Sequence, residues 1–511
     1  MFKKRKKIGP IMAFIILTAV TILMSGILHL LKVQGEYVTV NKATNTLINN
    51  VVEVKNLFSL SGMKYIVTHA VRNFVEFAPL STLIIVLIGI GILDKTGFLK
   101  SFFTVLTKNS KKNTITFILI FICLLFSLLG DIGFVVMLPI AALLFKYGRR
   151  NPFGGIIASF ASLSFGSGIN IFLSSTDSSL LNLTLNAARI TDPNYNIGTF
   201  FSLFIMIVLL IITSFVFTYI TEKKIMPLLP RVESEEEEVV ITNRELRGLI
   251  IGLGAGILYT LIVIYMIIPG LPLSGTLLDH SASKYIDMLF GANSLFNQGF
   301  IFIVTVLFAI IGFGYGFMSK TVKNSKDVTD SLAYSLDGIG NVLVLMFFAS
   351  LFMMVFEESH IGEVFCAFVT NLLGGIKFSG IGLILIAIVL IAIANLFCPD
   401  PLSKWTIISG TMVPLFMNAS ISPEFAQIVF NAGDAMTNGI TPLLVFFVIY
   451  LAFLEKYNTS QTEGISVGGS MKYLLQYATY FAIIMVLAVV GWYMIGIPTG
   501  IGSFPGVTYG A

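Results

Sequence analysis

Charged residues are scarce in this 511-residue chain. Asp, Glu, Lys and Arg make up 12% of it, against 56% hydrophobic residues and a mean hydropathy of +0.91. A soluble globular domain usually carries about 25% charged residues. Apolar runs of roughly 17 to 25 residues recur along the sequence, which is the length that crosses a hydrocarbon core about 30 Å thick. The shortage of charge therefore excludes a soluble domain and indicates a polytopic membrane protein.

Cysteine and histidine are also few. The three cysteines, Cys123, Cys366 and Cys398, lie in or beside apolar runs, and their odd number does not suit a disulfide framework. The four histidines are scattered, and none belongs to the HExxH pair of a zinc hydrolase. The sequence has no nucleotide-binding motif. These absences argue against an intramembrane enzyme and against a pump driven by ATP hydrolysis within this chain.

The basic residues gather at the ends of the apolar runs, where they act as orientation signals, so the net charge of +5 needs no nucleic-acid partner. The first run, after MFKKRKK, is too long for a cleaved signal peptide. With basic clusters on the inside, we predict a multi-pass protein of the cytoplasmic membrane with a cytoplasmic N-terminus and an extracytoplasmic C-terminus. The predicted uninterrupted spans are about 11–31, 79–98, 199–220, 248–269, 297–318, 336–357 and 473–495, and the polar stretch 32–76 is predicted to lie outside.

Two pairs of apolar runs are too short for each run to be a full membrane crossing. The first pair, about 113–145, has basic residues at both ends and Gly130–Asp131 in its middle. The second pair, about 381–417, is divided by the polar stretch NLFCPDPLSKW, which runs from Asn395 to Trp405. We interpret each pair as a re-entrant hairpin, because a polar tip is tolerated at membrane depth only where protein or a water-filled cavity surrounds it.

A crossing broken by polar residues follows each hairpin. The first, about 153–190, is broken around Asp177 in SSTDSS, and the second, about 422–454, is broken at NAGDAMTNGITP, which contains Asp434. When the basic clusters are kept on the inside and the crossings are counted, the two units have opposite orientations. This is the inverted-repeat plan of secondary transporters, whose binding sites form at the midplane of the membrane. In the alternative, proline and glycine only kink ordinary spans, and the basic clusters would then no longer all lie on the inside.

Ionisable residues at membrane depth are costly and mark ion or substrate paths. Asp177 and Asp434 are predicted where half-helix ends leave carbonyl groups unpaired, so that oxygen atoms could hold a hard cation such as Na⁺. The same carboxylates could carry a proton, or could cap the second half-helix by accepting from backbone N–H groups. Asn395, Thr437 and Asn438 offer further amide and hydroxyl oxygens nearby. The sequence leaves the choice between Na⁺, H⁺ and a capping role open.

Three residues of the hairpin tips have alternative interpretations. Trp405 has a large apolar face on which an aromatic ring could stack, or it could anchor the chain at the membrane interface. Lys404 is predicted to extend toward water rather than to touch a substrate. Asp131 is as suited to capping the returning helix as to binding a ligand.

Several motifs, in order along the chain, resemble the p-aminobenzoyl-glutamate transporter (AbgT) family. They are VKNLFSLSGMKYI, NFVEFAPLSTLI, VVMLPIAALLFKYGRRNPFGG, SSTDSSLLN, SPEFAQIVFNAGD and GWYMIGIPTG, and they extend from about residue 50 to the C-terminus. The resemblance implies a homodimer with a scaffold and a mobile transport domain. It also implies a small-molecule substrate: cation-coupled movement of p-aminobenzoyl-glutamate, or efflux of sulfonamide-type antimetabolites, with Na⁺ or H⁺ as the coupling ion and no other cofactor.

The predicted fold is therefore an all-α polytopic membrane protein with about nine transmembrane helices plus two re-entrant hairpins in inverted repeats, an elevator-type secondary transporter. Its predicted parts are the N-terminal scaffold spans and extracytoplasmic segment (1–112), the first hairpin and broken helix of the transport domain (113–190), scaffold and connecting spans with an acidic cytoplasmic linker at 222–246 (191–379), the second hairpin and broken helix (380–455), and the last span (456–511).

The resemblance also assigns site residues. The matching positions are Asp177 in the first break, Asn395 and Trp405 in the second hairpin tip, Asp434 and Pro442 in the second break, and Pro423; Ser174, Ser175 and Thr176 of the SSTDSS string complete the predicted substrate set. Two positions depart from the family pattern. Asn431 stands where the family usually carries an arginine, and the tip reads CPDPLSKW in place of a run rich in Ser and Ala. Because a bidentate arginine holds a carboxylate strongly, we expect a substrate with one carboxylate to be preferred over a dianion.

Two other functional classes remain open on the sequence alone. An intramembrane enzyme would need a nucleophile and base or a metal-binding pair, and a passive channel is expected to form its pore from a ring of subunits. Uptake into liposomes that depends on an ion gradient separates a secondary transporter from both.

Overall fold

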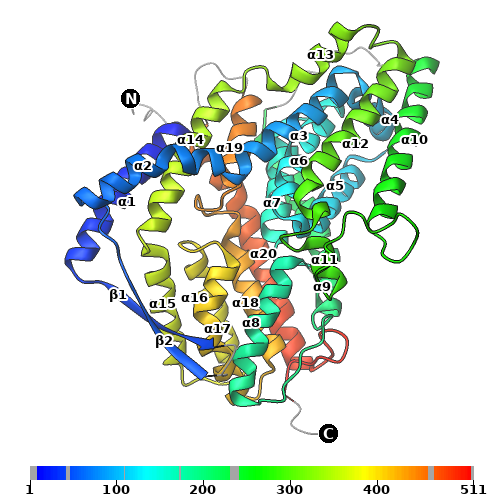
Figure 1. Cartoon of the computed structure of the whole chain (residues 1–511). Helices are drawn as coiled ribbons and strands as arrows, with labels where there is room; N and C mark the ends of the chain where they lie inside the picture. The colour runs from blue at the N-terminus through cyan, green and yellow to red at the C-terminus, as the bar shows by residue number, and fades with distance from the viewer. Residues whose placement is uncertain are drawn as a thin grey trace.

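The structure is a computed structural model that describes residues 8–41, 46–108, 110–171, 174–230, 241–458 and 465–507. It is mostly helical, and most of its long helices run side by side (Figure 1). The predicted all-α fold needs one correction, because β1 (Gln34–Asn41) and β2 (Thr46–Glu53) pair as an antiparallel hairpin. This hairpin lies against the helices at one edge of the molecule (Figure 1).

Eight stretches of the described chain are long and apolar enough to cross a membrane. They are α1 (Pro10–Leu30), α2 and α3 (Leu60–Glu76, Ala78–Lys95), α5 with η1 (Lys112–Phe126, Ser127–Leu129), α9 with η2 and η3 (Leu203–Ile220, Thr221–Ile225, Met226–Leu228), α10 (Asn243–Met266), α12 (Leu295–Ser319), α14 (Gly340–Glu358) and α20 (Val467–Ile495). Seven of the eight coincide with the uninterrupted spans predicted from the sequence, and the other is the first helix of the first predicted hairpin.

The remaining helices are shorter. They are α4 (Phe98–Lys108), α6 (Asp131–Tyr147), α7 (Pro152–Gly166), α8 (Ser175–Thr191), α11 (Tyr285–Phe290), α13 (Ser325–Ala333), η4 (Tyr334–Leu336), α15 (Ile361–Gly374), α16 (Ile381–Asn395), α17 (Pro401–Asn418), α18 (Pro423–Asn438) and α19 (Phe447–Lys456).

Both predicted pairs of short helices are present, as α5 with α6 and as α16 with α17. The first pair turns at Gly130, whose φ of 52° favours glycine. In the second pair, Asp400 caps α17 by accepting from the Ser403 N–H at 2.7 Å, and Pro401 occupies the first helical position. The polar stretch CPDP is therefore a signal that ends one helix and starts the next.

A helix broken in the middle follows each pair. The first break lies between α7 and α8, at residues 167–174, as the sequence predicts. The second break lies later than predicted, because NAGDAMTN is helical and forms the end of α18, and the break runs from 439 to 446. Pro442 explains this position, since proline disfavours helical geometry in the residue before it and cannot donate to the preceding turn. Asp434 is therefore a helical residue and does not lie in the break itself.

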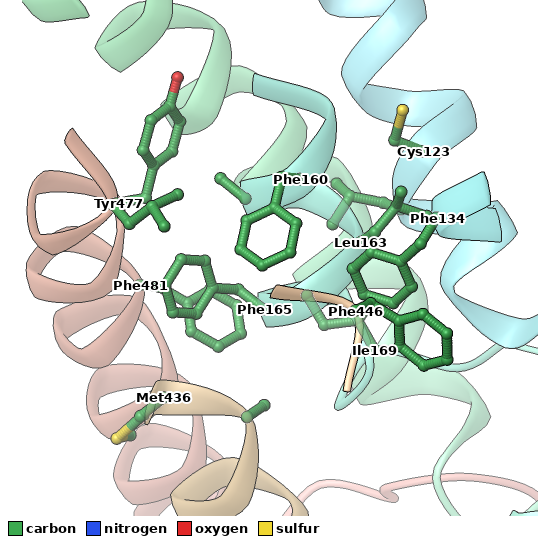
Figure 2. Packing of buried hydrophobic residues seen from close by; sticks show 14 of the residues in the cluster. Cys123, Phe134, Phe160, Leu163, Phe165, Ile169, Met436, Phe446, Tyr477 and Phe481 are labelled. Atoms are coloured by element: carbon green, nitrogen blue, oxygen red, sulfur yellow. The ribbon is translucent and has the colours of Figure 1, made fainter. Parts of the chain in front are cut away.

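The two broken helices meet near their breaks. In Figure 1, α7 lies above α8, whereas α18 lies below α19, so the chain runs through the two breaks in opposite directions. Aromatic side chains of α6, α7, α20 and the second break pack closely around this region (Figure 2). The ring centroids of Phe134 and Phe446 lie 4.8 Å apart, and those of Phe165 and Phe481 lie 5.6 Å apart. Closely packed aromatic rings thus support the breaks from this side.

Gly168 allows the first break to approach α18. A Cβ atom at this position would lie 2.7 Å from Ala435 Cβ and 2.9 Å from the Asn431 carbonyl oxygen. We expect Gly168→Ala to destabilise the protein by about 1 to 3 kcal/mol, because the backbone of α18 has to shift. Thermal unfolding in detergent measures this loss. Gly491→Ala in α20 is the matched control, since a Cβ there meets no atom within 4 Å; equal melting temperatures for the two variants would contradict the prediction.

Two segments are more structured than the sequence indicates. The stretch predicted as polar and extracytoplasmic, 32–76, contains β1, β2 and the amphipathic helix α2. Helix α15 follows α14 directly and was not predicted, because its 14 residues are too few for a span. It holds the β-hairpin in place, since Asn371 Nδ2 donates to the Glu36 carbonyl oxygen at 3.1 Å.

The predicted linker at 222–246 is shorter in the structure. Helical geometry continues from α9 to Leu228, and α10 begins at Asn243 after a capping box formed by Thr242 and Glu245. Glu222 belongs to the π-helical turn η2 and accepts a hydrogen bond from Arg150 Nη2 at 2.5 Å; both side chains are almost fully buried. The acidic run at 233–238 lies outside the described residues.

Candidate ion and substrate site

The centre of the second unit is an ion pair between Lys404 of α17 and Asp434 of α18. Lys404 is completely buried and Asp434 is 6% exposed. The ammonium contacts Asp434 Oδ1 and donates hydrogen bonds to Asn395 Oδ1 and, at 2.8 Å, to the Cys398 carbonyl oxygen. Asp434 Oδ1 accepts no hydrogen bond from the described residues, so its contact with Lys404 is an ion pair outside hydrogen-bond geometry. The prediction that Lys404 extends toward water is wrong, because these three oxygens surround its ammonium.

Asn395 joins the end of α16 to the last turn of α18. Its Nδ2 lies 2.8 Å from the Asp434 carbonyl oxygen, 2.8 Å from Asn438 Oδ1 and 3.0 Å from Thr437 Oγ1. Asn438 in turn donates to Ser167 Oγ of the first break at 2.8 Å. Positions 434, 437 and 438 share one helix face because they are three and four residues apart. The structure therefore brings together Asn395, Asp434, Thr437 and Asn438, each of which the sequence proposes as an ion- or proton-coupling residue.

Asp177 has the geometry of a helix cap. Ser174 is the N-cap of α8, and its Oγ accepts from the Asp177 N–H at 3.1 Å. The Asp177 carboxylate accepts from the Ser174 N–H at 3.0 Å and from Asn170 Nδ2 at 3.0 Å. This arrangement is the capping alternative that the sequence left open. Thr176 is exposed, and the side chain of Ser175 lies outside what the structure describes, as does that of Asp131.

Asn170 adds an unused oxygen beside this carboxylate. Its Nδ2 is committed to Asp177, whereas its Oδ1 is buried and accepts no hydrogen bond from the described part of the chain. A buried acceptor without a donor is unfavourable, and a bound cation or water would satisfy it. Asp177 and Asn170 together therefore offer carboxylate and amide oxygens of the kind that hard cations bind.

A narrow cavity connects the first break to α18. Its volume of about 20 Å³ holds a water molecule or an ion but no organic substrate. Its lining residues come from the first break, from the start of α9 and from one face of α18; they are Gly168, Asn170, Ile171, Asp177, Thr199, Phe200, Phe201, Ser202, Leu203, Met206, Gln427 and Asn431. Two predicted site residues, Asp177 of α8 and Asn431 of α18, thus line the same cavity.

Gln427 and the stretch 199–203 were not predicted as part of the site. A sequence signal existed for Gln427, since it lies four residues before Asn431 and therefore shares its helix face. No local signal marks residues 199–203, because hydrogen bonds to the distant C-terminal residues Thr499 and Ile501 hold them in place.

Trp405 is fully buried, and its polar and apolar groups both have partners. Its Nε1 donates to Thr184 Oγ1 of α8 at 2.9 Å, and its ring packs against Phe430 with centroids 4.4 Å apart. In this conformation it joins α17 to α8 and α18. Pro423 starts α18 at the first helical position, and Pro442 lies in the second break. The two prolines position α18 by fixing where it starts and ends.

Comparison with known proteins gives one consistent result. The model of the AbgT transporter family matches residues 6–507. The p-aminobenzoyl-glutamate transport protein of Escherichia coli (strain K12) is 24% identical over 498 residues, which cover 97% of this chain and 94% of that protein.

Two solved structures are also similar in sequence. The YdaH transporter of Alcanivorax borkumensis is 26% identical, with 96% of this chain and 100% of that chain covered and a TM-score of 0.48. MtrF of Neisseria gonorrhoeae, described with a class of antimetabolite efflux pumps, is 27% identical, with 97% of each chain covered and a TM-score of 0.48. The family match spans nearly the whole sequence, so this chain belongs to the AbgT family and is a membrane transporter, not an enzyme.

Proposed function

We propose that this transporter is a cation-coupled secondary transporter of p-aminobenzoyl-glutamate or of a related aromatic or amino-acid-like compound with one carboxylate. The observation that carries the proposal is a carboxylate centre in each unit. Half-buried Asp177 shares a small cavity with Asn170 and Asn431. Buried Asp434 pairs with Lys404, and its neighbour Asn438 donates to Ser167 of the first break. Buried carboxylates are costly in a membrane protein and mark ion paths. A small polar site between them can therefore couple an ion to a substrate.

The coupling ion is proposed to be Na⁺ or H⁺. Asp177 is the better Na⁺ candidate, because Asn170 Oδ1 adds a second oxygen that has no donor among the described residues. The substrate carboxylate is proposed to reach Asn431 and Gln427 when the cavity widens, with Trp405 and Ser174 to Thr176 at its edge. The cavity is too small for a substrate in the present conformation, so binding requires movement.

We propose alternating access as the source of this movement. The units α5 to α8 and α16 to α19 have the same helix order, and their breaks run in opposite directions (Figure 1), which supports an inverted repeat. On this proposal the two units form the centre of a mobile transport domain, and helices outside them form the scaffold of a homodimer, in the cytoplasmic membrane, with the N-terminus inside and the C-terminus outside.

Proteoliposomes test the proposed function. We expect p-aminobenzoyl-glutamate or a monocarboxylate analogue such as p-aminobenzoate to accumulate above its equilibrium level under an inward Na⁺ or H⁺ gradient, and to leak out when an ionophore removes that gradient. The same vesicles loaded with a sulfonamide test the efflux alternative. Uptake that stops at the equilibrium level under every gradient would contradict coupled transport and indicate a passive pore.

The proposed movement predicts a change in accessibility at the second hairpin tip. Phe397 is 40% exposed there, so Phe397→Cys is expected to react with a membrane-impermeant maleimide at a rate that changes at least twofold when ion and substrate are added. Leu273, in the loop after α10, is 90% exposed, so Leu273→Cys is the control whose labelling rate should stay constant. Equal labelling of Phe397→Cys under all conditions would argue for a static structure.

A further inference from the structure

The Lys404 ammonium lies among three oxygen atoms of different chemical types. They are the carboxylate Oδ1 of Asp434, the amide Oδ1 of Asn395 and the backbone carbonyl of Cys398. An ammonium has three N–H groups and no acceptor; here it donates to the amide and the carbonyl oxygen, and the carboxylate supplies the counter-charge. The side chain has no exposed surface, and the Phe430 ring lies 5.9 Å from Nζ on another side. The Lys404 ammonium is thus surrounded by oxygen ligands and closed off from solvent, as a bound cation would be.

The same three oxygens are the ligands that a hard monovalent cation would use. Carboxylate, amide and carbonyl oxygens bind such cations, and the unwound ends of half-helices supply the carbonyls in transporters. The Cys398 carbonyl is available because it lies between the end of α16 and the start of α17. A second cation placed here beside Lys404 would face a like charge in a region of low dielectric constant.

We propose that Lys404 acts as a tethered cation, whose ammonium occupies at Asp434 the position that Na⁺ would otherwise take. Na⁺ is therefore excluded from Asp434 while the pair is closed, and the centre at Asp177 is left as the place for an external cation. This inference rests on the proposed function only in treating the cation at Asp177 as a coupling ion. The occupation of the Asp434 site by Lys404 is a binding property and does not depend on transport.

The tethered cation also bears on the substrate. The family resemblance places an arginine at position 431, and this chain has Asn431 there, three residues before Asp434. If Lys404 separates from Asp434 during the transport cycle, its ammonium becomes a buried positive charge that a substrate carboxylate can pair with. One ammonium can balance one carboxylate, so this arrangement favours the singly charged substrates of the proposed function.

The test measures Na⁺ binding to the purified full-length protein, without transport. All variants carry Asp177→Asn, so that only the Asp434 centre can respond. Melting temperature and binding of radioactive ²²Na⁺ are compared in NaCl and in N-methyl-D-glucamine chloride of equal ionic strength. We expect the Asp177→Asn protein to bind no ²²Na⁺ and to melt at the same temperature in both salts.

Removing the ammonium should create a Na⁺ site. Lys404→Met keeps the apolar stem of the side chain and removes its charged end, and we expect it to gain saturable ²²Na⁺ binding and a melting temperature that rises with NaCl. Adding Asp434→Asn should abolish both gains. Lys404→Ala, which leaves room for water, serves as the second variant if Lys404→Met does not fold.

Two results would overturn the proposal. One is Na⁺ binding by the Asp177→Asn protein that Asp434→Asn removes, since the site would then be open beside Lys404. The other is the absence of any Na⁺ response in folded Lys404→Met and Lys404→Ala. Neither result depends on transport, so a failure of this inference is distinguishable from a failure of the proposed function.

Discussion

Replacing Asp434 by asparagine is expected to abolish gradient-driven transport and to lower the free energy of unfolding by about 3 to 5 kcal/mol. The substitution leaves the Lys404 ammonium completely buried with no counter-charge, and breaking a buried pair on one side strands the other charge. Uptake into proteoliposomes and thermal unfolding measure the two effects. On the sequence alone, asparagine would keep the shape of the site and leave the fold intact, and the buried lysine changes that expectation.

A double variant separates the two effects of this substitution. Asp434→Asn combined with Lys404→Met removes both charges, and replacing a buried pair by neutral groups is often close to neutral for stability. We therefore expect the double variant to recover most of the lost stability and none of the transport. Normal transport by Asp434→Asn at every ion concentration would show that this carboxylate has no part in coupling.

Introducing an arginine at Asn431 is expected to shift substrate preference toward a dianion. Asn431 lines the cavity that also contains Asp177 and Gln427, so a guanidinium there can reach a substrate in the same space. Hydrogen bonds to charged groups contribute about 1.5 to 3 kcal/mol, which corresponds to roughly a ten- to hundredfold gain in affinity. Competition binding of p-aminobenzoyl-glutamate against a related monocarboxylate measures the shift.

Asn431→Lys is the matched control for this substitution. A lysine adds the same charge but presents it as a point, without the planar bidentate contact, and should give a smaller gain. Tight binding of the dianion by the wild-type protein, unchanged in both variants, would mean that other groups hold the second carboxylate.

The helices and their interruptions could be predicted because they depend on local sequence. Hydrophobic run length indicated seven of the long helices, and CPDP marked the turn between α16 and α17 through capping and proline geometry. The predicted second break, NAGDAMTNGITP, begins too early, because glycine and polar residues in this stretch are compatible with a helix that is buried in protein. Gly433 and Asp434 lie inside α18, which ends only where Pro442 requires it.

The ion pair at the centre of the site could not be predicted. A lysine beside a tryptophan in a polar hairpin tip has an apolar stem long enough to reach water, and local sequence cannot show otherwise. Lys404 is buried because Asp434, thirty residues later, and the Cys398 carbonyl both face it. Asn395 and Asp434 were predicted individually, but their joint contact with Lys404 depends on how α16, α17 and α18 pack.

The buried pair between Arg150 and Glu222 determines which helices can move together. Arg150 Nη1 also donates to Thr116 Oγ1 of α5 at 2.8 Å, so the first hairpin, the turn before α7 and the end of α9 share one network. Separating these elements would strand a charge away from water, at a cost comparable to the loss of a buried ion pair. Helix α9 is therefore expected to travel with the first hairpin as one rigid body. If the proposed movement takes place, the border between moving and fixed parts is expected beyond Leu228, and not near residue 190 as the sequence predicts.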